Sequence, residues 1–134
     1  MKGTTRFTRL TSGIPRPIEK PMASFKQGDV VKVPFPCTDR ATRQSRPALV
    51  VSVGGLEDAH NLIWVVMITS AENRSWPGDV AVTNLSGAGL PAASVIRAAK
   101  IATIDAADAT KLGKVSAAQV KQVLGGIGRE LGLE

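Results

Sequence analysis

From Phe25 onward, short apolar runs alternate with turn residues, a pattern typical of a small, strongly curved sheet. The first run, KQGDVVKVPF at 26–35, predicts a strand. Gly28 and Asp29 form the turn that leads into it, and the prolines that follow the apolar residues end it. A curved sheet therefore begins close to residue 25.

A polar segment follows, CTDRATRQSR at 37–46, with three arginines and no large apolar residue. Such a segment cannot pack inward, so it is predicted to be an exposed loop. Pro47 then starts the second predicted strand, ALVVSV at 48–53, because the first residue of a strand tolerates a missing amide hydrogen. The second strand thus begins directly after a cluster of positive charge.

The third predicted strand, LIWVVMITS at 62–70, is the most apolar run of the chain. It lacks polar alternation, which predicts cover on both faces, either within the fold or by a second copy of the molecule. The residues between the second and third strands, 54–61, are predicted to form a loop that opens with two glycines. A short fourth strand is expected at DVAVTN, 79–84.

The last two segments differ in how well their patterns define them. Apolar residues in AASVIRAAKIATI, 92–104, fit both a helical spacing and the alternation of a strand, so periodicity leaves both open. Further on, Ser116 and Gln119 have the spacing of a capping box. After them, one helical face repeats apolar residues at Val120, Val123, Leu124, Ile127 and Leu131. The predicted fold class is therefore mainly β with a C-terminal helix packed against the sheet.

Length and composition add limits to this picture. A chain of 134 residues is long enough for one domain with its own core, and the net charge is +6. Residues 1–22 hold five basic residues against one acidic residue, and three prolines. We expect a flexible basic extension there and a folded domain over 23–134. The single cysteine, Cys37, and the absence of a long apolar run favour a cytoplasmic protein without a membrane span.

Few residues offer catalytic chemistry. His60 stands alone, and the chain has neither an HExxH motif nor a cysteine cluster, so no metal or cofactor is expected. GAGLPA at 87–92 matches the nucleotide-binding pattern GxGxxG/A. That pattern needs a βαβ context, which a late position in a strand-rich chain does not provide, so a turn is predicted instead.

One pair of residues gains meaning from the predicted topology. If the second and third strands pair as an antiparallel hairpin, the start of one lies beside the end of the other. Arg46 and Thr69 would then meet at one edge of the sheet, which predicts an anion site. The alternative is a basic loop that is merely solvated.

These residues also belong to a set of short motifs whose order and spacing resemble the MazF/PemK family of toxins from bacterial toxin-antitoxin systems. The motifs are GDVVKVPFP at 28–36, TD at 38–39, RPALVVS at 46–52, ITS at 68–70, AGL at 88–90, SVIR at 94–97 and KIATID at 100–105. The resemblance implies a small SH3-like or PemK-type curved barrel with a C-terminal helix. It also implies that the ambiguous segment is strand.

The same resemblance implies a homodimeric, metal-independent endoribonuclease that cuts single-stranded RNA and is bound by a cognate antitoxin protein. Arg46 and Thr69 match the family's catalytic pair. RNA supplies its own nucleophile, the 2′-hydroxyl, so the protein mainly orients the chain and stabilises charge on the phosphate. The predicted substrate-binding residues are Arg43, Gln44, Ser70 and Ser94.

Two other functions remain open at this stage. A non-enzymatic toxin of the same fold, like the CcdB type, would act by protein contact and would hardly depend on Arg46 or Thr69. A nucleic-acid-binding module without cleavage would use the same basic residues, and its RNA affinity would fall steeply with salt.

Overall fold

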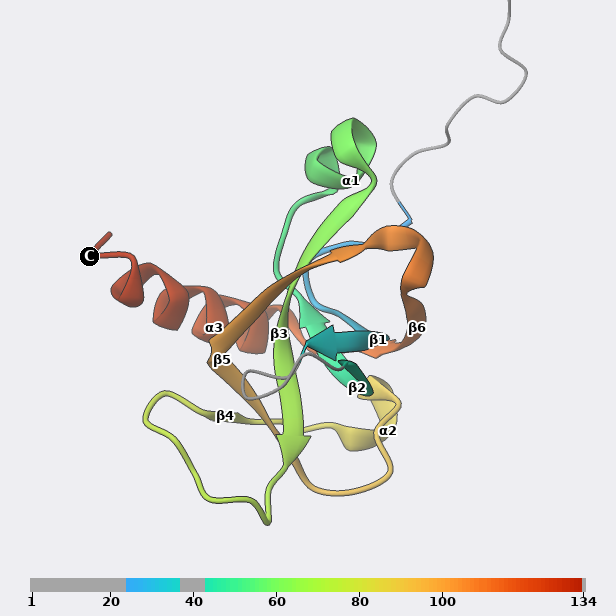
Figure 1. Cartoon of the computed structure of the whole chain (residues 1–134). Helices are drawn as coiled ribbons and strands as arrows, with labels where there is room; N and C mark the ends of the chain where they lie inside the picture. Colours follow the sequence, from blue (N-terminus) through green and yellow to red (C-terminus); the bar gives the residue numbers. More distant parts are fainter. Residues whose placement is uncertain (1–23, 37–42, 134) are drawn as a thin grey trace, which may run out of the picture.

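The computed structural model describes residues 24–36 and 43–133 (Figure 1). One antiparallel sheet of six strands has the order β4-β5-β3-β2-β1-β6. The strands are β1 Asp29–Pro36, β2 Arg43–Val50, β3 Leu62–Ser70, β4 Val80–Ala81, β5 Ser94–Asp105 and β6 Thr110–Lys114. The helices are α1 Gly54–His60, α2 Leu85–Ala88 and α3 Ala117–Glu130, with a 3-10 turn at Ala106–Asp108. The sheet curls into a half-barrel with α3 at its side, which confirms the predicted fold class.

Strand β3 lies in the middle of the sheet and is covered on both faces. Its residues enter two core clusters in alternation: Ile63, Val65 and Met67 the first, Val66 and Ile68 the second. Helix α3 covers the second cluster with the fully buried Val123. The predicted burial of this strand is thus confirmed within the fold for its middle, whereas Trp64 is 47% exposed and the end residues Leu62 and Ser70 are partly buried and exposed, respectively.

The second strand is longer than the sequence predicts. It begins at Arg43, so residues 43–46 belong to a strand instead of a loop, and the proposed start at Pro47 is wrong. Pro47 pairs with Lys32 of β1, whereas pairing with β3 starts one residue later, at Ala48. The first part of β2 therefore has a partner on one side only, and a proline there interrupts no ladder with β3.

Two further predictions are corrected or narrowed. Residues 54–60 form α1 instead of a loop. This helix has only about two turns, which is too short to give a periodic signal in the sequence. A tertiary contact holds it in place, because the buried Glu57 accepts the amide hydrogen of Phe25 at 3.0 Å. The fourth strand is only Val80–Ala81. The ambiguous segment is strand β5, paired with β3 and β4, as the family resemblance implies.

The capping box at the start of α3 is half formed. Ser116 Oγ accepts the backbone hydrogen of Gln119 at 3.3 Å. The Gln119 side chain does not return this bond but turns to the sheet, where Nε2 donates to the Ala81 carbonyl at 2.6 Å and Oε1 accepts from the Thr83 amide at 3.2 Å. Helix α3 is therefore joined at its first turn to the end of β4.

The GAGLPA segment has a structural reason for its glycines. Gly89 ends the four-residue helix α2 in the left-handed conformation, with φ of 73°. A Cβ atom there would collide with the backbone carbonyl of Leu112 in β6. The predicted turn is confirmed, because glycine lets α2 end and pack directly against β6.

Some predictions fall outside the described residues: the basic extension at 1–22 and Cys37 with the rest of the segment up to residue 42. His60 is exposed at the end of α1. Within residues 24–36 and 43–133, no helix is long and apolar enough to cross a membrane. Nor does that part of the chain bring together three or more residues of the metal-binding types.

Candidate functional site

Arg46 and Gln44 occupy neighbouring positions on one face of β2. They pair with Val33 and Phe35 of β1, which both belong to the first core cluster. Arg46 Nη2 donates to Gln44 Oε1 at 2.8 Å. The glutamine therefore orients a half-buried guanidinium on the strand that leads to residues 37–42.

Thr69 lies near the end of β3 and is 6% exposed. Its hydroxyl oxygen accepts a hydrogen bond from Asn73 Nδ2 at 2.7 Å. The alternation of β3 puts Thr69 on the same face as Met67, which belongs to the first cluster. The hydroxyl is thus held at the edge of the core by a residue of the following loop.

The register of the sheet relates Arg46 to Thr69. Strands β2 and β3 are antiparallel, as predicted, and their ladder ends at the pair Ala48 and Met67. Two further residues along each strand lead to Arg46 and Thr69, on the face shared with that last pair. The two residues thus lie at the same end of adjacent strands, beyond the last rung, and no direct hydrogen bond joins them.

The predicted substrate-binding serines lie on a different face of the sheet from Arg46 and Thr69. Ser70 and Ser94 pair directly across β3 and β5. Ser94 Oγ donates to the Ala92 carbonyl at 2.8 Å, and Ser70 Oγ accepts the Glu72 amide hydrogen at 3.1 Å. Strand alternation turns both away from the face that holds Thr69. The sequence therefore groups residues that the sheet places on two faces.

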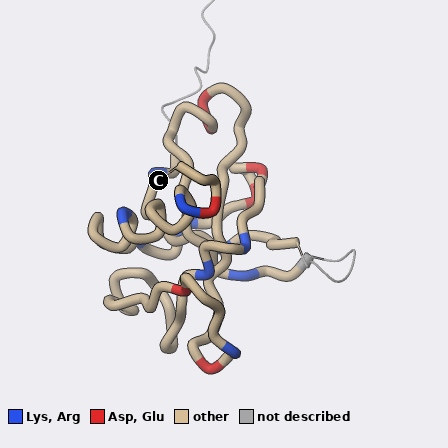
Figure 2. Tube along the Cα trace, turned by 90° about the vertical axis from the view of Figure 1, so that its left-hand side faces the viewer, with Lys and Arg blue, Asp and Glu red and all other residues tan. Residues whose placement is uncertain are grey.

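For Arg43, the remaining predicted residue, the structure describes the backbone, which pairs with Pro36. Its side chain lies outside the described part. Figure 2 shows basic positions along the strand pair that leads to residues 37–42. Among the described residues, no carboxylate forms an ion pair with Arg46.

Residues 71–79, the loop between β3 and β4, contain a cluster that the sequence analysis missed. Arg97 of β5 is 5% exposed, and its Nε and Nη2 donate to the Asp79 carboxylate at 3.1 and 2.9 Å. Nη2 also donates to the Arg74 carbonyl at 2.8 Å, and the guanidinium lies 4.4 Å from the centre of the Trp76 ring. One buried arginine therefore joins the loop to the sheet.

The same contacts determine the charge state of Asp79. The hydrogen bond from Arg97 lowers the pKa of the Asp79 carboxyl, and the bond from the Trp76 amide acts in the same direction, while burial opposes them. The SVIR motif contains Arg97, but nothing in its spacing indicates a partner 18 residues earlier. Asn73 likewise carries no local signal, since it belongs to an ordinary polar loop.

These contacts define what the site can do. Arg46, which forms no ion pair with a described carboxylate, and the oriented Thr69 hydroxyl lie at the ends of two adjacent strands. Arginine can bind two oxygens of a phosphate in a fixed plane, and a hydroxyl can donate to a phosphate oxygen as well. The model of PemK-like, MazF-like toxins of type II toxin-antitoxin systems matches residues 26–131. The chain belongs to this family.

Solved structures of MazF-like toxins share the fold. MazF from Deinococcus radiodurans is 25% identical with a TM-score of 0.63, over 80% of this toxin and 96% of that chain. A chain of the MazE-MazF complex from the same organism is 24% identical, with a TM-score of 0.63 and 81% and 96% covered. A mycobacterial endoribonuclease in complex with its cognate antitoxin is 20% identical, with a TM-score of 0.63 and 83% and 98% covered. A search of curated proteins gives no match.

Proposed function

We propose that this toxin is an endoribonuclease that cuts single-stranded RNA at a short sequence without a metal ion. The observation that carries the proposal is the position of Arg46 and Thr69 at the same end of adjacent strands, in a chain of the MazF-like family. The mycobacterial structure of the same fold is itself an endoribonuclease.

The proposed reaction needs little chemistry from the protein. The RNA 2′-oxygen attacks the neighbouring phosphorus as the bond to the 5′-oxygen breaks, which leaves a 2′,3′-cyclic phosphate and a 5′-hydroxyl end. The 2′-hydroxyl loses its proton and the departing 5′-oxygen gains one. Catalysis then rests on in-line alignment and on donors directed at the charge that develops on the phosphate oxygens.

The site residues divide this work. Arg46 binds the non-bridging oxygens, oriented by its bond to Gln44, and Thr69 donates its hydroxyl hydrogen. Arg43 and Gln44 hold the RNA on the approach to the scissile phosphate, where arginine also stacks on unpaired bases. Because Ser70 and Ser94 belong to the other face, we assign them to a nucleotide away from that phosphate.

We also propose an antitoxin protein as partner. Structures of the same fold occur with MazE or with a cognate antitoxin. The net charge of +6 and the position of Arg46 at this end of the sheet suit an acidic, partly apolar segment that competes with RNA for this face.

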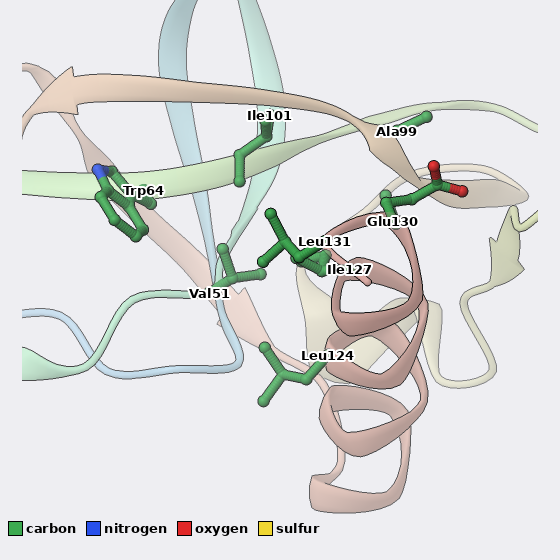
Figure 3. A pocket seen from close by; sticks show the side chains of 9 residues that line it. Val51, Trp64, Ala99, Ile101, Leu124, Ile127, Glu130 and Leu131 are labelled. Atoms are coloured by element: carbon green, nitrogen blue, oxygen red, sulfur yellow. The ribbon is translucent and has the colours of Figure 1, made fainter. Parts of the chain in front are cut away.

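The toxin is further proposed to be a homodimer that uses an apolar groove of about 400 Å³ (Figure 3). Leu124 and Ile127 of α3 and Leu131 directly after it line one side, with Trp64 and Ile101 of the sheet across from them. A second, smaller hollow continues over Trp64 and Ile101, so the apolar surface extends beyond the groove. Such a surface favours a second apolar surface over RNA, and a second copy supplies one.

Incubation of the purified toxin with a long single-stranded RNA in EDTA tests the activity. We expect cleavage at one short motif with 5′-hydroxyl ends. Arg46→Ala should reduce the rate by a factor of about 100 or more, as loss of a donor to a developing oxyanion does. Arg46→Lys keeps the charge without the planar pair of donors. Its cleavage rate should therefore lie between those of the wild type and Arg46→Ala.

Intact RNA under these conditions would contradict the proposal. If the RNA is bound in a salt-dependent manner but not cut, the toxin is a binding module. If the folded protein neither binds nor cuts RNA, a toxin that acts by protein contact becomes the better explanation.

A further inference from the structure

The hydrogen bond between Asn73 and Thr69 determines what the threonine hydroxyl can do next. A hydroxyl has one hydrogen to donate and two lone pairs that accept. Asn73 Nδ2 donates to Thr69 Oγ1 at 2.7 Å, so the hydroxyl uses a lone pair there and keeps its hydrogen for another acceptor. Because Thr69 is 6% exposed, few directions remain open to that hydrogen.

We propose that Asn73 is a positioning residue for RNA cleavage, which directs the Thr69 hydroxyl hydrogen to a non-bridging oxygen of the scissile phosphate. The inference rests on the proposed function of this site. It adds a residue that touches no RNA in this scheme and acts through the threonine. A donor that is already oriented when the substrate arrives does not have to reorganise as charge develops.

The surrounding contacts hold Asn73 in place for this role. Its backbone amide donates to the Ser70 carbonyl at 3.1 Å, which forms a turn directly after β3. The far end of the same loop is fixed to β5 by Arg97, through the Asp79 carboxylate and the Arg74 carbonyl. Asn73 is exposed, but the loop that carries it is fastened at both ends.

The direction of the bond suggests a test by substitution. Asn73→Ala removes the donor and leaves the hydroxyl free to rotate. Asn73→Asp places a carboxylate there, which only accepts and therefore takes the Thr69 hydrogen for itself. Single-turnover cleavage should fall about 10-fold in the alanine variant and further in the aspartate variant.

A double-mutant cycle separates positioning from direct action. Thr69→Val removes the hydroxyl at nearly constant shape, and in that background Asn73→Ala should have no further effect on the rate. Affinity for an RNA with a 2′-deoxy nucleotide at the cleavage site should stay within twofold of the wild type in the alanine variant. Ser75→Ala, in the same loop with an exposed side chain, is the matched control and should cleave like the wild type.

Two results would overturn the inference while the proposed function stands. One is a wild-type rate in Asn73→Ala; the other is an undiminished effect of Asn73→Ala in the Thr69→Val background, which would mean that asparagine acts on RNA directly. Thermal unfolding of every variant checks that a lower rate is not loss of the fold. If the wild type itself leaves RNA intact, the proposed function fails and the inference with it.

Discussion

At the scale of single residues, two arginines of the toxin differ through their surroundings. Arg97 is buried against the Asp79 carboxylate and the Trp76 ring, so its charge is compensated inside the protein. Arg46 is half buried, touches the neutral Gln44 side chain and has no carboxylate partner among the described residues. Both residues belong to motifs that resemble those of the family, yet Arg97 stabilises a loop, whereas Arg46 is the residue that we propose binds phosphate.

The Arg97–Asp79 pair leads to a pH-dependent prediction. Because Arg97 lowers the pKa of Asp79 in the folded state, the pair contributes its full stability above the unfolded pKa of about 4. That contribution is lost as pH falls through the lowered folded value. Asp79→Asn should reduce the free energy of unfolding by roughly 3 kcal/mol at pH 7, since a buried cation loses its counter-charge. The deficit should shrink toward pH 3.

Urea unfolding of the wild type and the variant at both pH values measures this difference. A deficit that stays constant between pH 7 and pH 3 would show that the charge of Asp79 contributes nothing.

At the scale of elements, the join between α3 and β4 shows how a local signal and a tertiary contact compete for one side chain. Gln119 occupies the third helical position of the capping box, and the Ser116 hydroxyl accepts its backbone amide hydrogen as the motif requires. Burial of Gln119, which is 6% exposed, decides the rest, because its side-chain amide finds its partners in the Ala81 carbonyl and the Thr83 amide. The glutamine amide satisfies both groups, since it donates and accepts.

Gln119→Glu discriminates between these two roles. A capping box accepts glutamate as readily as glutamine, so local logic predicts no loss. The contact with β4 predicts a loss of about 1–3 kcal/mol, because a carboxylate cannot donate to the Ala81 carbonyl. Gln122→Glu, exposed on the same helix, is the control and should change stability by no more than about 0.5 kcal/mol. Equal stability of both variants in chemical unfolding would refute the tertiary role.

At the scale of the whole molecule, the toxin has two surfaces of different chemistry. The ends of β2 and β3 present charge and hydroxyl groups, whereas the groove beside α3 presents large apolar side chains, with Ile101 51% and Leu131 67% exposed. Exposure of such apolar side chains to water is unfavourable. Burial of about 100 Å² of apolar area contributes roughly 2.5 kcal/mol to association. Under the proposed function, this division separates the dimer contact from the RNA site.

Ile101→Glu tests the proposed homodimer. A carboxylate in the groove would be desolvated on association, so the variant should elute as a monomer in size-exclusion chromatography with light scattering, whereas the wild type has twice the chain mass. Val53→Glu makes the same change at another exposed apolar residue, 63% exposed and outside the groove, and should remain dimeric. A dimeric Ile101→Glu variant would assign the interface to another face. A monomeric wild type would rule out the homodimer and leave the groove to another partner.

The amino-acid sequence by itself determined the features whose signals are local. The apolar run at 62–70 defined β3 to the residue, because a short run of mostly apolar, β-branched residues between turn residues is typical of a buried strand. The face repeated from Val120 to Leu131 defined α3, and Ser116 defined its start. The position of Arg46 and Thr69 at the same end of adjacent strands followed from one assumption, that neighbouring strands pair as a hairpin.

Tertiary structure alone decided the features that join distant parts of the chain. Strand β2 begins at Arg43 because β1 pairs with it there, although the local composition is that of a loop. Helix α1 depends on the hydrogen bond from the Phe25 amide to the Glu57 carboxylate, and the loop after β3 depends on Arg97. Glu57 and Arg97 are buried polar residues whose partners lie many residues away, and the periodicity of the sequence does not indicate such partners. The hydroxyl that Asn73 orients acquires its direction in the same way, from a loop that the sheet holds in place.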